Sequence, residues 1–184
     1  MKHLMIDIET LSNEPNAMIL SIGAAFFCPQ LGVTATFHEY IDVEDSIRFN
    51  RHIAPSTVLW WMGQSDAARQ TMIDNQKQSK SLRSVLQRFW EFINEYSFWE
   101  ELQVWGNGSD FDNVILASSY KALGLSVPWK FYNNRCYRTL KNRHTDIKMN
   151  RKGIHHDALA DAISQAEHAI EIFRQHPVTG GVPL

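Results

Sequence analysis

The N-terminal segment, residues 3–10, places two acidic residues in an otherwise apolar run, HLMIDIET. Such a run predicts a buried strand, in which successive side chains alternate between faces, so Asp7 and Glu9 share one face. The opposite face is apolar and consists of Leu4, Ile6 and Ile8. Carboxylates this close repel each other, and divalent cations that prefer oxygen ligands, such as Mg²⁺, remove the repulsion. An edge strand with one solvated face is the alternative that these residues leave open.

The length and composition predict one α/β domain. The chain has 184 residues, 44% of them hydrophobic, which is enough for a sizeable core. We expect a single domain over residues 1–175 and a flexible tail over 176–184, which is rich in Pro and Gly. The formal charge of −2 argues against a protein that coats nucleic acid through a global basic field. Only Cys28 and Cys136 are present, so a reduced, intracellular setting with free thiols is expected.

The longest apolar stretch, residues 17–28, is too short for a membrane span of about 20 residues. Asp7 interrupts the N-terminal run before a secretory signal could form. We therefore expect a cytoplasmic protein with no membrane partner.

The pattern of hydrophobic residues predicts a mixed sheet flanked by helices. An apolar strand, a short turn at 29–32 and a second strand would complete a three-stranded antiparallel meander with residues 3–10. Helical spacing and turn residues then predict alternating helices and strands, as in parallel crossovers. The expected strands are 18–27, 33–41, 102–106 and 129–132, and the expected helices are 56–64, 65–74, 81–96, 111–123 and 157–173.

A second acidic element, Asp110 and Asp112, follows the strand expected at 102–106. A strand, a glycine-containing turn and a helix start aim side chains at the carboxyl edge of a sheet. Each residue also has a structural explanation, because Asp110 fits a helix N-cap and Asp112 fits the first helical turn.

A third element, HHDALAD, begins the last helix. Asp161 falls beside the apolar stripe of this helix, where an unpaired carboxylate is unfavourable, so it needs a partner. His156 stands at the helix entrance, where a capping or packed surface histidine is also ordinary.

These three elements, in this order, resemble the DEDDh-type 3′ to 5′ exonuclease superfamily. The motifs are D-I-E-T at 7–10, F-D-N at 111–113 and H-x-x-x-x-D at 156–161. The run G-N-G-x-x-F-D-N at 106–113 resembles the corresponding run of small single-domain phage and bacterial members. If the protein is encoded by a phage, we expect it to act in the host cytoplasm. The resemblance covers most of the chain and implies a ribonuclease H-like fold, with the strand at 3–10 beside the strand that carries Trp105.

The resemblance implies four metal-binding carboxylates and a histidine, namely Asp7, Glu9, Asp112, Asp161 and His156. Asp112 is preferred over Asp110 because it follows an aromatic residue, and His156 is preferred over His155 by its distance from Asp161. The implied reaction is two-metal hydrolysis of phosphodiester bonds, with two Mg²⁺ or Mn²⁺ ions and release of nucleoside 5′-monophosphates. His156 would take the proton of the attacking water, a task suited to imidazole, whose ordinary pKa is near 6.5.

The residues expected to bind substrate are less specific. Thr10 and Leu11 follow the first motif and would touch the terminal nucleotide, although Leu11 also fits a core. Trp60, Trp61 and Gln64 resemble another element of the phage and bacterial branch. Adjacent indoles on a helix diverge by about 100°, so one of them should face a groove and could stack on a base.

One basic concentration precedes the last helix: Arg135, Arg138, Lys141, Arg143, Lys148, Arg151 and Lys152. It predicts either a solvated face or a phosphate track. The expected partner is the 3′ end of single-stranded DNA or RNA, and the sequence leaves a homodimer open. Two alternatives are a non-catalytic nucleic-acid-binding module of the same fold and a phosphodiesterase of short oligonucleotides.

Overall fold

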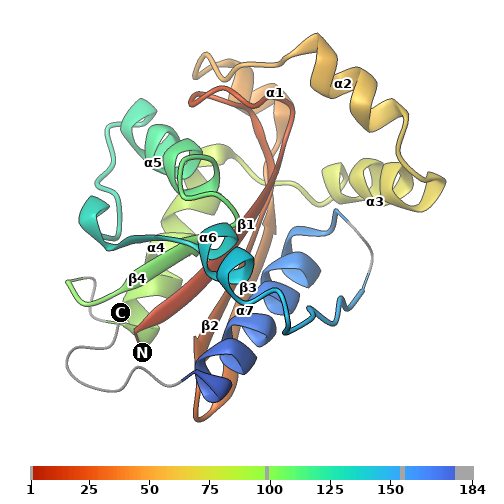
Figure 1. Ribbon diagram of the computed structural model, residues 1–184. Coiled ribbons are helices and arrows are strands. Elements are labelled where there is room, and N and C mark those ends of the chain that lie inside the picture. Colours follow the sequence, from red (N-terminus) through yellow and green to blue (C-terminus); the bar gives the residue numbers. More distant parts are fainter. Residues whose placement is uncertain (1, 98–99, 154–155, 177–184) are drawn as a thin grey trace.

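The computed structural model of the protein describes residues 2–97, 100–153 and 156–176. Five strands form one sheet in the order β3-β2-β1-β4-β5 (Figure 1). The strands are β1 (His3–Thr10), β2 (Ile19–Cys28), β3 (Gly32–Tyr40), β4 (Gln103–Gly106) and β5 (Asn134–Cys136). The helices are α1 (Val43–Ile47), α2 (Pro55–Met62), α3 (Asp66–Gln76), α4 (Leu82–Tyr96), α5 (Asp112–Ala122), α6 (Tyr137–Arg143) and α7 (Ala158–Gln175), with a 3₁₀ turn at Phe131–Asn133.

The sheet is mixed, as the sequence predicts. β1, β2 and β3 pair antiparallel as a meander, whereas β4 and β5 run parallel to β1. The strand order puts β1 beside β4, so the acidic strand is central and Asp7 is not on an edge. The expectation that β1 neighbours the strand carrying Trp105 is confirmed, with Met5 directly opposite Trp105.

Each face of the sheet has its own apolar core. On one face, α4 and α5 cover Leu4, Ile6 and Ile8 of β1. On the other face, α7 and the start of α6 cover Met5, Ala25 and Phe27. Side chains alternate along a strand, so Met5, Asp7 and Glu9 point to the face opposite Leu4, Ile6 and Ile8. Both carboxylates therefore lie on the α7 side of the sheet.

The strand predicted at 129–132 is wrong; the structure forms β5 instead, which begins at Asn134, beyond the end of the predicted strand. Trp129 is a core residue whose indole N–H donates to Asn134 Oδ1 at 2.9 Å. Phe131 and Tyr132 are exposed in the 3₁₀ turn, so the aromatic residues that suggested a strand do not share a sheet. The short helices α1 and α6 were also not predicted as separate elements.

Within the described residues, no helix is both long and apolar enough to cross a membrane. Of the predicted tail, 177–184 lies outside the described residues.

Candidate active site

All four predicted carboxylates and His156 line one cavity of about 240 Å³ beside the carboxyl ends of β1 and β4. They come from three parts of the chain that lie more than 40 residues apart, namely β1, the start of α5 and the start of α7. The described residues that line the cavity are Asp7, Ile8, Glu9, Asn107, Phe111, Asp112, Arg138, Arg151, His156, Asp161 and Gln165.

β1 supplies Asp7 and Glu9, both partly buried. The pairing register with β2 shifts between Glu9 and Thr10: Glu9 pairs with Ser21 and Thr10 pairs with Ile19. Irregularities of this kind bend a strand and re-aim its side chains. The strand therefore changes course directly after the second carboxylate.

Asp112 is the first residue of α5 and is only 3% exposed. Its Oδ1 accepts a hydrogen bond from the Ile8 backbone N–H at 3.3 Å, which ties α5 to β1. Gly106 permits this approach, because a Cβ there would lie 2.9 Å from Asp112 Oδ2. The N-cap interpretation of Asp110 is wrong: Phe111 occupies the N-cap position, and Asp110 is exposed.

Asp161 reaches the cavity because the N-terminus of α7 lies directly on the sheet. Gly23 of β2 is paired with Asp7, and a Cβ on Gly23 would fall 2.1 Å from the carbonyl carbon of Ala158. Only a residue without a Cβ allows this contact. Asp157 caps the helix by accepting the Ala160 N–H at 2.9 Å, and Asp161 lies one turn further along.

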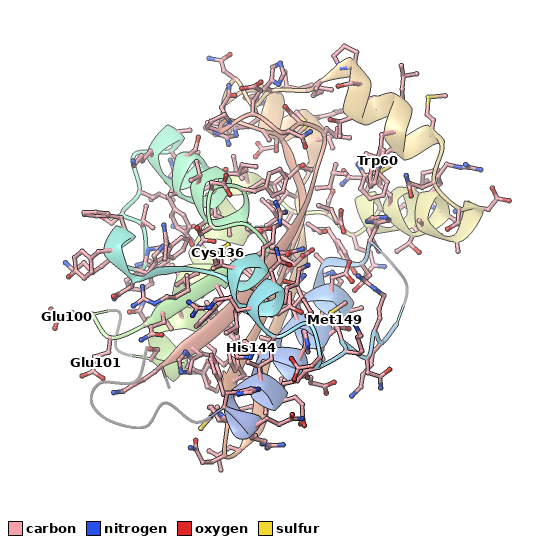
Figure 2. The ribbon with its side chains drawn as sticks, in the orientation of Figure 1. Trp60, Glu100, Glu101, Cys136, His144 and Met149 are labelled. Carbon is pink, nitrogen blue, oxygen red and sulfur yellow. The ribbon has the colours of Figure 1, made fainter. Side chains whose placement is uncertain are left out.

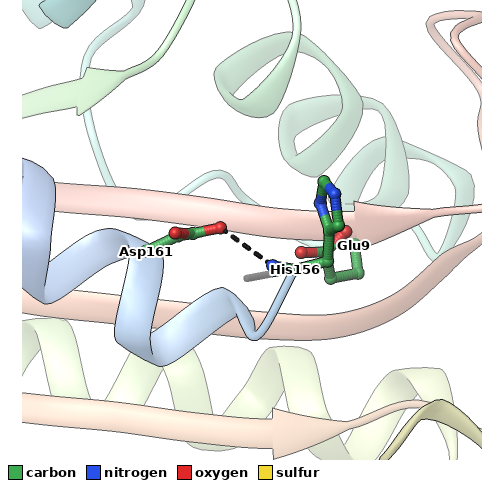
Figure 3. Close-up of side chains that lie close together, drawn as sticks. All are labelled: Glu9, His156 and Asp161. Atoms are coloured by element: carbon green, nitrogen blue, oxygen red, sulfur yellow. Dashed lines mark hydrogen bonds between the residues drawn. The ribbon is translucent and has the colours of Figure 1, made fainter. Parts of the chain in front are cut away.

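His156 is held in a left-handed backbone conformation, with φ 66°. Its backbone N–H donates to Asp161 Oδ2 at 3.3 Å (Figure 3). Its ring packs edge-on against Trp60 and Trp61, with centroid separations of 4.9 and 5.8 Å. Side-chain ligand atoms of Glu9, His156 and Asp161 all lie within 4.8 Å of one another. His155, the alternative to His156, lies outside the described residues.

Burial and mutual repulsion make the ionised carboxylates costly. Burial, followed by the charges of Asp112, Glu9 and Asp161, raises the pKa of Asp7 well above its ordinary value. Burial and the neighbouring Asp161 raise the pKa of Glu9 to about 8, and burial raises that of Asp112 to about 7. Shifts in this direction arise where carboxylates share a site, and a bound cation reverses them.

The donor set fits divalent cations. It offers four carboxylates, the ligands that Mg²⁺ and Mn²⁺ prefer. The cavity wall also holds two amide oxygens, Asn107 Oδ1 and Gln165 Oε1, which are buried and have no hydrogen-bond partner among the described residues. Buried amide oxygens normally accept a hydrogen bond, so these two atoms agree with a site in which a cation, or water bound to it, is their partner.

A second cavity of about 340 Å³ adjoins the first and shares Glu9 with it. Trp60 projects from α2 (Figure 2), is 46% exposed and lines this cavity, with its ring against that of His156. Trp61 is buried and donates its indole N–H to the Thr10 carbonyl at 2.9 Å, so the two indoles differ as the helix geometry predicts. Thr10 also lines the cavity.

Leu11 and Gln64 are not among the described residues that line these two cavities. Leu11 is partly buried, and the Gln64 side chain donates to the carbonyl of Trp60 at 3.1 Å. The structure thus brings Thr10, Trp60 and Trp61 to the site but not these two residues.

Sequence reasoning missed Gln165 and Asn107. The Gln165 side chain donates to Asp7 Oδ1 at 2.8 Å, and its position four residues after Asp161 on the same helix could have revealed it. Asn107 directly follows β4, where side chains at the carboxyl edge of the sheet gather. Of the predicted basic run, Arg138 and Arg151 line the carboxylate cavity.

Solved structures with the same fold are nucleases. The nuclease domain of 3′hExo, a DEDDh family member bound to rAMP, has a TM-score of 0.64 and 16% identity, covering 95% of this chain and 92% of that one. Escherichia coli exonuclease I in complex with a dT13 oligonucleotide has a TM-score of 0.65 and 14% identity. The match covers 95% of this chain but only 41% of exonuclease I. At these identities the likeness establishes the ribonuclease H-like fold.

Sequence comparison gives the family. An exodeoxyribonuclease of enterobacteria phage T4 is 27% identical over 157 residues, which covers 73% of this chain and 68% of the phage protein. The family model of the 3′-5′ exoribonuclease Rv2179c-like domain matches residues 2–173. The chain therefore belongs to the Rv2179c-like family of 3′-5′ exoribonuclease domains and is an exonuclease.

Proposed function

We propose that the protein removes nucleoside 5′-monophosphates one at a time from the 3′ end of single-stranded nucleic acid, with two divalent cations. The observation that carries this proposal is the convergence of Asp7, Glu9, Asp112, Asp161 and His156 on one cavity. A binding module of the same fold would not require all five groups at one place. Retention of the complete set therefore favours turnover over binding alone.

The four carboxylates would divide between two cations. Asp7, whose charge interacts with those of Asp112, Glu9 and Asp161, would contribute to both ions. Glu9 and Asp161 would hold one ion, and Asp112 the other. The bound ions would supply an activated water and neutralise charge on the scissile phosphate.

His156 would accept the proton of the attacking water. The contacts of its ring with Trp60 and Trp61 and the hydrogen bond of its backbone to Asp161 fix the imidazole beside Glu9. A general base positioned in this way contributes about 10²- to 10⁴-fold to the rate.

The cavity beside Glu9 would receive the terminal nucleotide. Its volume lies in the range of small-molecule sites, and the exposed Trp60 offers a face for stacking on any base. Thr10 would contribute van der Waals contacts, because its hydroxyl already donates to the Ser12 carbonyl at 2.8 Å and its own carbonyl already accepts the Trp61 indole N–H. We propose that both DNA and RNA are substrates: the family is described as exoribonuclease and the phage relative as exodeoxyribonuclease.

The test is digestion of matched single-stranded DNA and RNA oligonucleotides, labelled at the 5′ end, in Mg²⁺, Mn²⁺ or EDTA. We expect ladders that shorten from the 3′ end, 5′-mononucleotide products and no reaction in EDTA. An Asp7→Asn variant controls for contaminating nuclease. Undiminished digestion in EDTA, or mononucleotides that carry a 3′-phosphate, would refute the proposal.

A further inference from the structure

Among the residues that the structure describes, Arg151 is the basic residue that pairs directly with a cavity carboxylate. Its guanidinium Nη1 forms a hydrogen-bonded ion pair with Asp161 Oδ1, and both side chains line the carboxylate cavity. The Asp161 side chain is 10% exposed, whereas the Arg151 side chain is 39% exposed. One partner of this pair is fixed and nearly buried, and the other can reach solvent.

The segment that carries Arg151 is attached to α7. The backbone N–H of Lys152 donates to Ser164 Oγ at 3.0 Å, and the Lys152 ammonium pairs with Glu167 at 2.7 Å. Gly153 follows with φ 74°, and a Cβ there would lie 2.8 Å from the Cβ of Ala160. These contacts hold the backbone next to Arg151 and do not involve the Arg151 side chain.

We propose that Arg151 is the counterion of Asp161 when no divalent cation is bound, that cation binding displaces it, and that the displaced guanidinium then binds a phosphate of the substrate strand. This inference rests on the proposed function of the same site. Asp161 cannot keep a close guanidinium and also give that oxygen to a divalent cation. The released side chain would remain on the wall of the cavity that receives the scissile phosphate.

The chemistry of the two partners supports the exchange. A guanidinium is planar, stays charged and forms paired hydrogen bonds with carboxylates and phosphates alike. Arg138, the other arginine of the cavity, already donates to the Asn107 carbonyl at 2.6 Å. Arg151 is therefore the arginine whose present partner is a proposed cation ligand.

The first test measures Mg²⁺ and Mn²⁺ binding by calorimetry, without nucleic acid. Arg151→Gln should bind the cation about three- to tenfold more tightly, because a partly exposed ion pair no longer competes for Asp161. Arg48→Gln is the matched control, since it removes the same charge from a pair with Asp45 on a different element, in which the Arg48 side chain is 77% and the Asp45 side chain 17% exposed. Unchanged or weaker cation binding in Arg151→Gln would overturn the proposal.

The second test separates this role from a purely structural one. In EDTA, Arg151→Gln should melt at a lower temperature than the wild type, and saturating Mg²⁺ should abolish or reverse that difference. A deficit that persists equally in Mg²⁺ would mean that Arg151 is only structural.

The third test addresses the phosphate. With Mg²⁺ saturating, KM for a single-stranded oligonucleotide should rise about tenfold in Arg151→Gln, more than in Arg151→Lys, while kcat changes less. An unchanged KM would remove the phosphate contact from the proposal. Because cation binding and melting need no substrate, their outcome is independent of whether the chain is a 3′ exonuclease.

Discussion

In the proposed mechanism, His156 accepts a proton while the four carboxylates hold cations. His156→Ala should therefore lower turnover by about 10²- to 10⁴-fold and leave Mg²⁺ affinity nearly unchanged. Single-turnover rates and calorimetry on the same samples measure the two quantities. His155→Ala is the neighbouring control and should have a small effect. A His156→Ala variant with near wild-type turnover would exclude this residue as the base.

His3 provides a pH-dependent prediction away from the site. Burial, with smaller contributions from nearby positive charges, lowers its pKa to about 4, and its neutral ring accepts the Trp105 indole N–H at 3.2 Å. An unfolded histidine titrates near 6.5, so between these values the unfolded chain binds the proton more readily. The free energy of unfolding should thus fall as the pH drops from 6.5 toward 4, by up to about 1.4 kcal/mol per pH unit.

The comparison of wild type with His3→Gln isolates this contribution. Urea unfolding at several pH values should give a shallower fall in the variant over that range. Parallel pH profiles for the two proteins would show that His3 is not the responsible group.

Among the secondary-structure elements, the contact of β2 with α7 places Asp161 and His156. Gly23→Ala should push the first turn of α7 off the sheet, destabilise the protein by about 1–3 kcal/mol and reduce activity out of proportion to the loss of folded protein. Gly63→Ala is the control, since a Cβ there would meet its nearest neighbour, the Trp60 carbonyl oxygen, at an ordinary 3.4 Å. Denaturant melts and specific activity of the folded fraction test this, and a Gly23→Ala enzyme with unaltered activity would contradict it.

The sequence predicts the bounds of strands and helices well where the spacing of hydrophobic residues matches the side chains that are buried. β1, β2, β3, α4, α5 and α7 lie within a few residues of their expected bounds, because long apolar strands and amphipathic helices carry a strong period. β5 has three residues, all half-buried, so it has no pattern to detect. It is positioned by tertiary contacts, such as the one between Asn113 Nδ2 and Asn134 Oδ1 at 3.0 Å.

The candidate site, too, is predicted from the sequence only in part. The order of the motifs predicts that the four carboxylates and His156 lie together. It does not reveal that the Trp61 indole is hydrogen-bonded to the Thr10 carbonyl while the Trp60 indole is exposed. Nor does it indicate that Phe111 replaces Asp110 at the helix start. These outcomes depend on how α2 and α5 pack against β1, which no local sequence pattern encodes.

For the whole molecule, we expect repulsion among the carboxylates to link folding to cation binding. Mg²⁺ should raise the melting temperature of the wild type, because a ligand that binds only the folded state stabilises it. Asp7→Asn should melt at or above the wild-type temperature in EDTA, since it removes one crowded charge, and should respond little to Mg²⁺. Asp110→Asn, an exposed acidic residue, should behave as the wild type in both conditions. Calorimetric melts test this, and a large loss of stability for Asp7→Asn in EDTA would assign Asp7 a structural role.

The most direct test of the whole account compares a linear single-stranded oligonucleotide, labelled at its 5′ end, with a covalently closed circle of the same sequence. Wild-type protein in Mg²⁺ should shorten the linear strand stepwise from its 3′ end and leave the circle intact. Asp110→Asn should act like the wild type, and Asp112→Asn should leave both strands uncut while remaining folded. Cleavage of the circle, or an Asp112→Asn protein as active as the wild type, would contradict the assignment of this cavity as a 3′ exonuclease site.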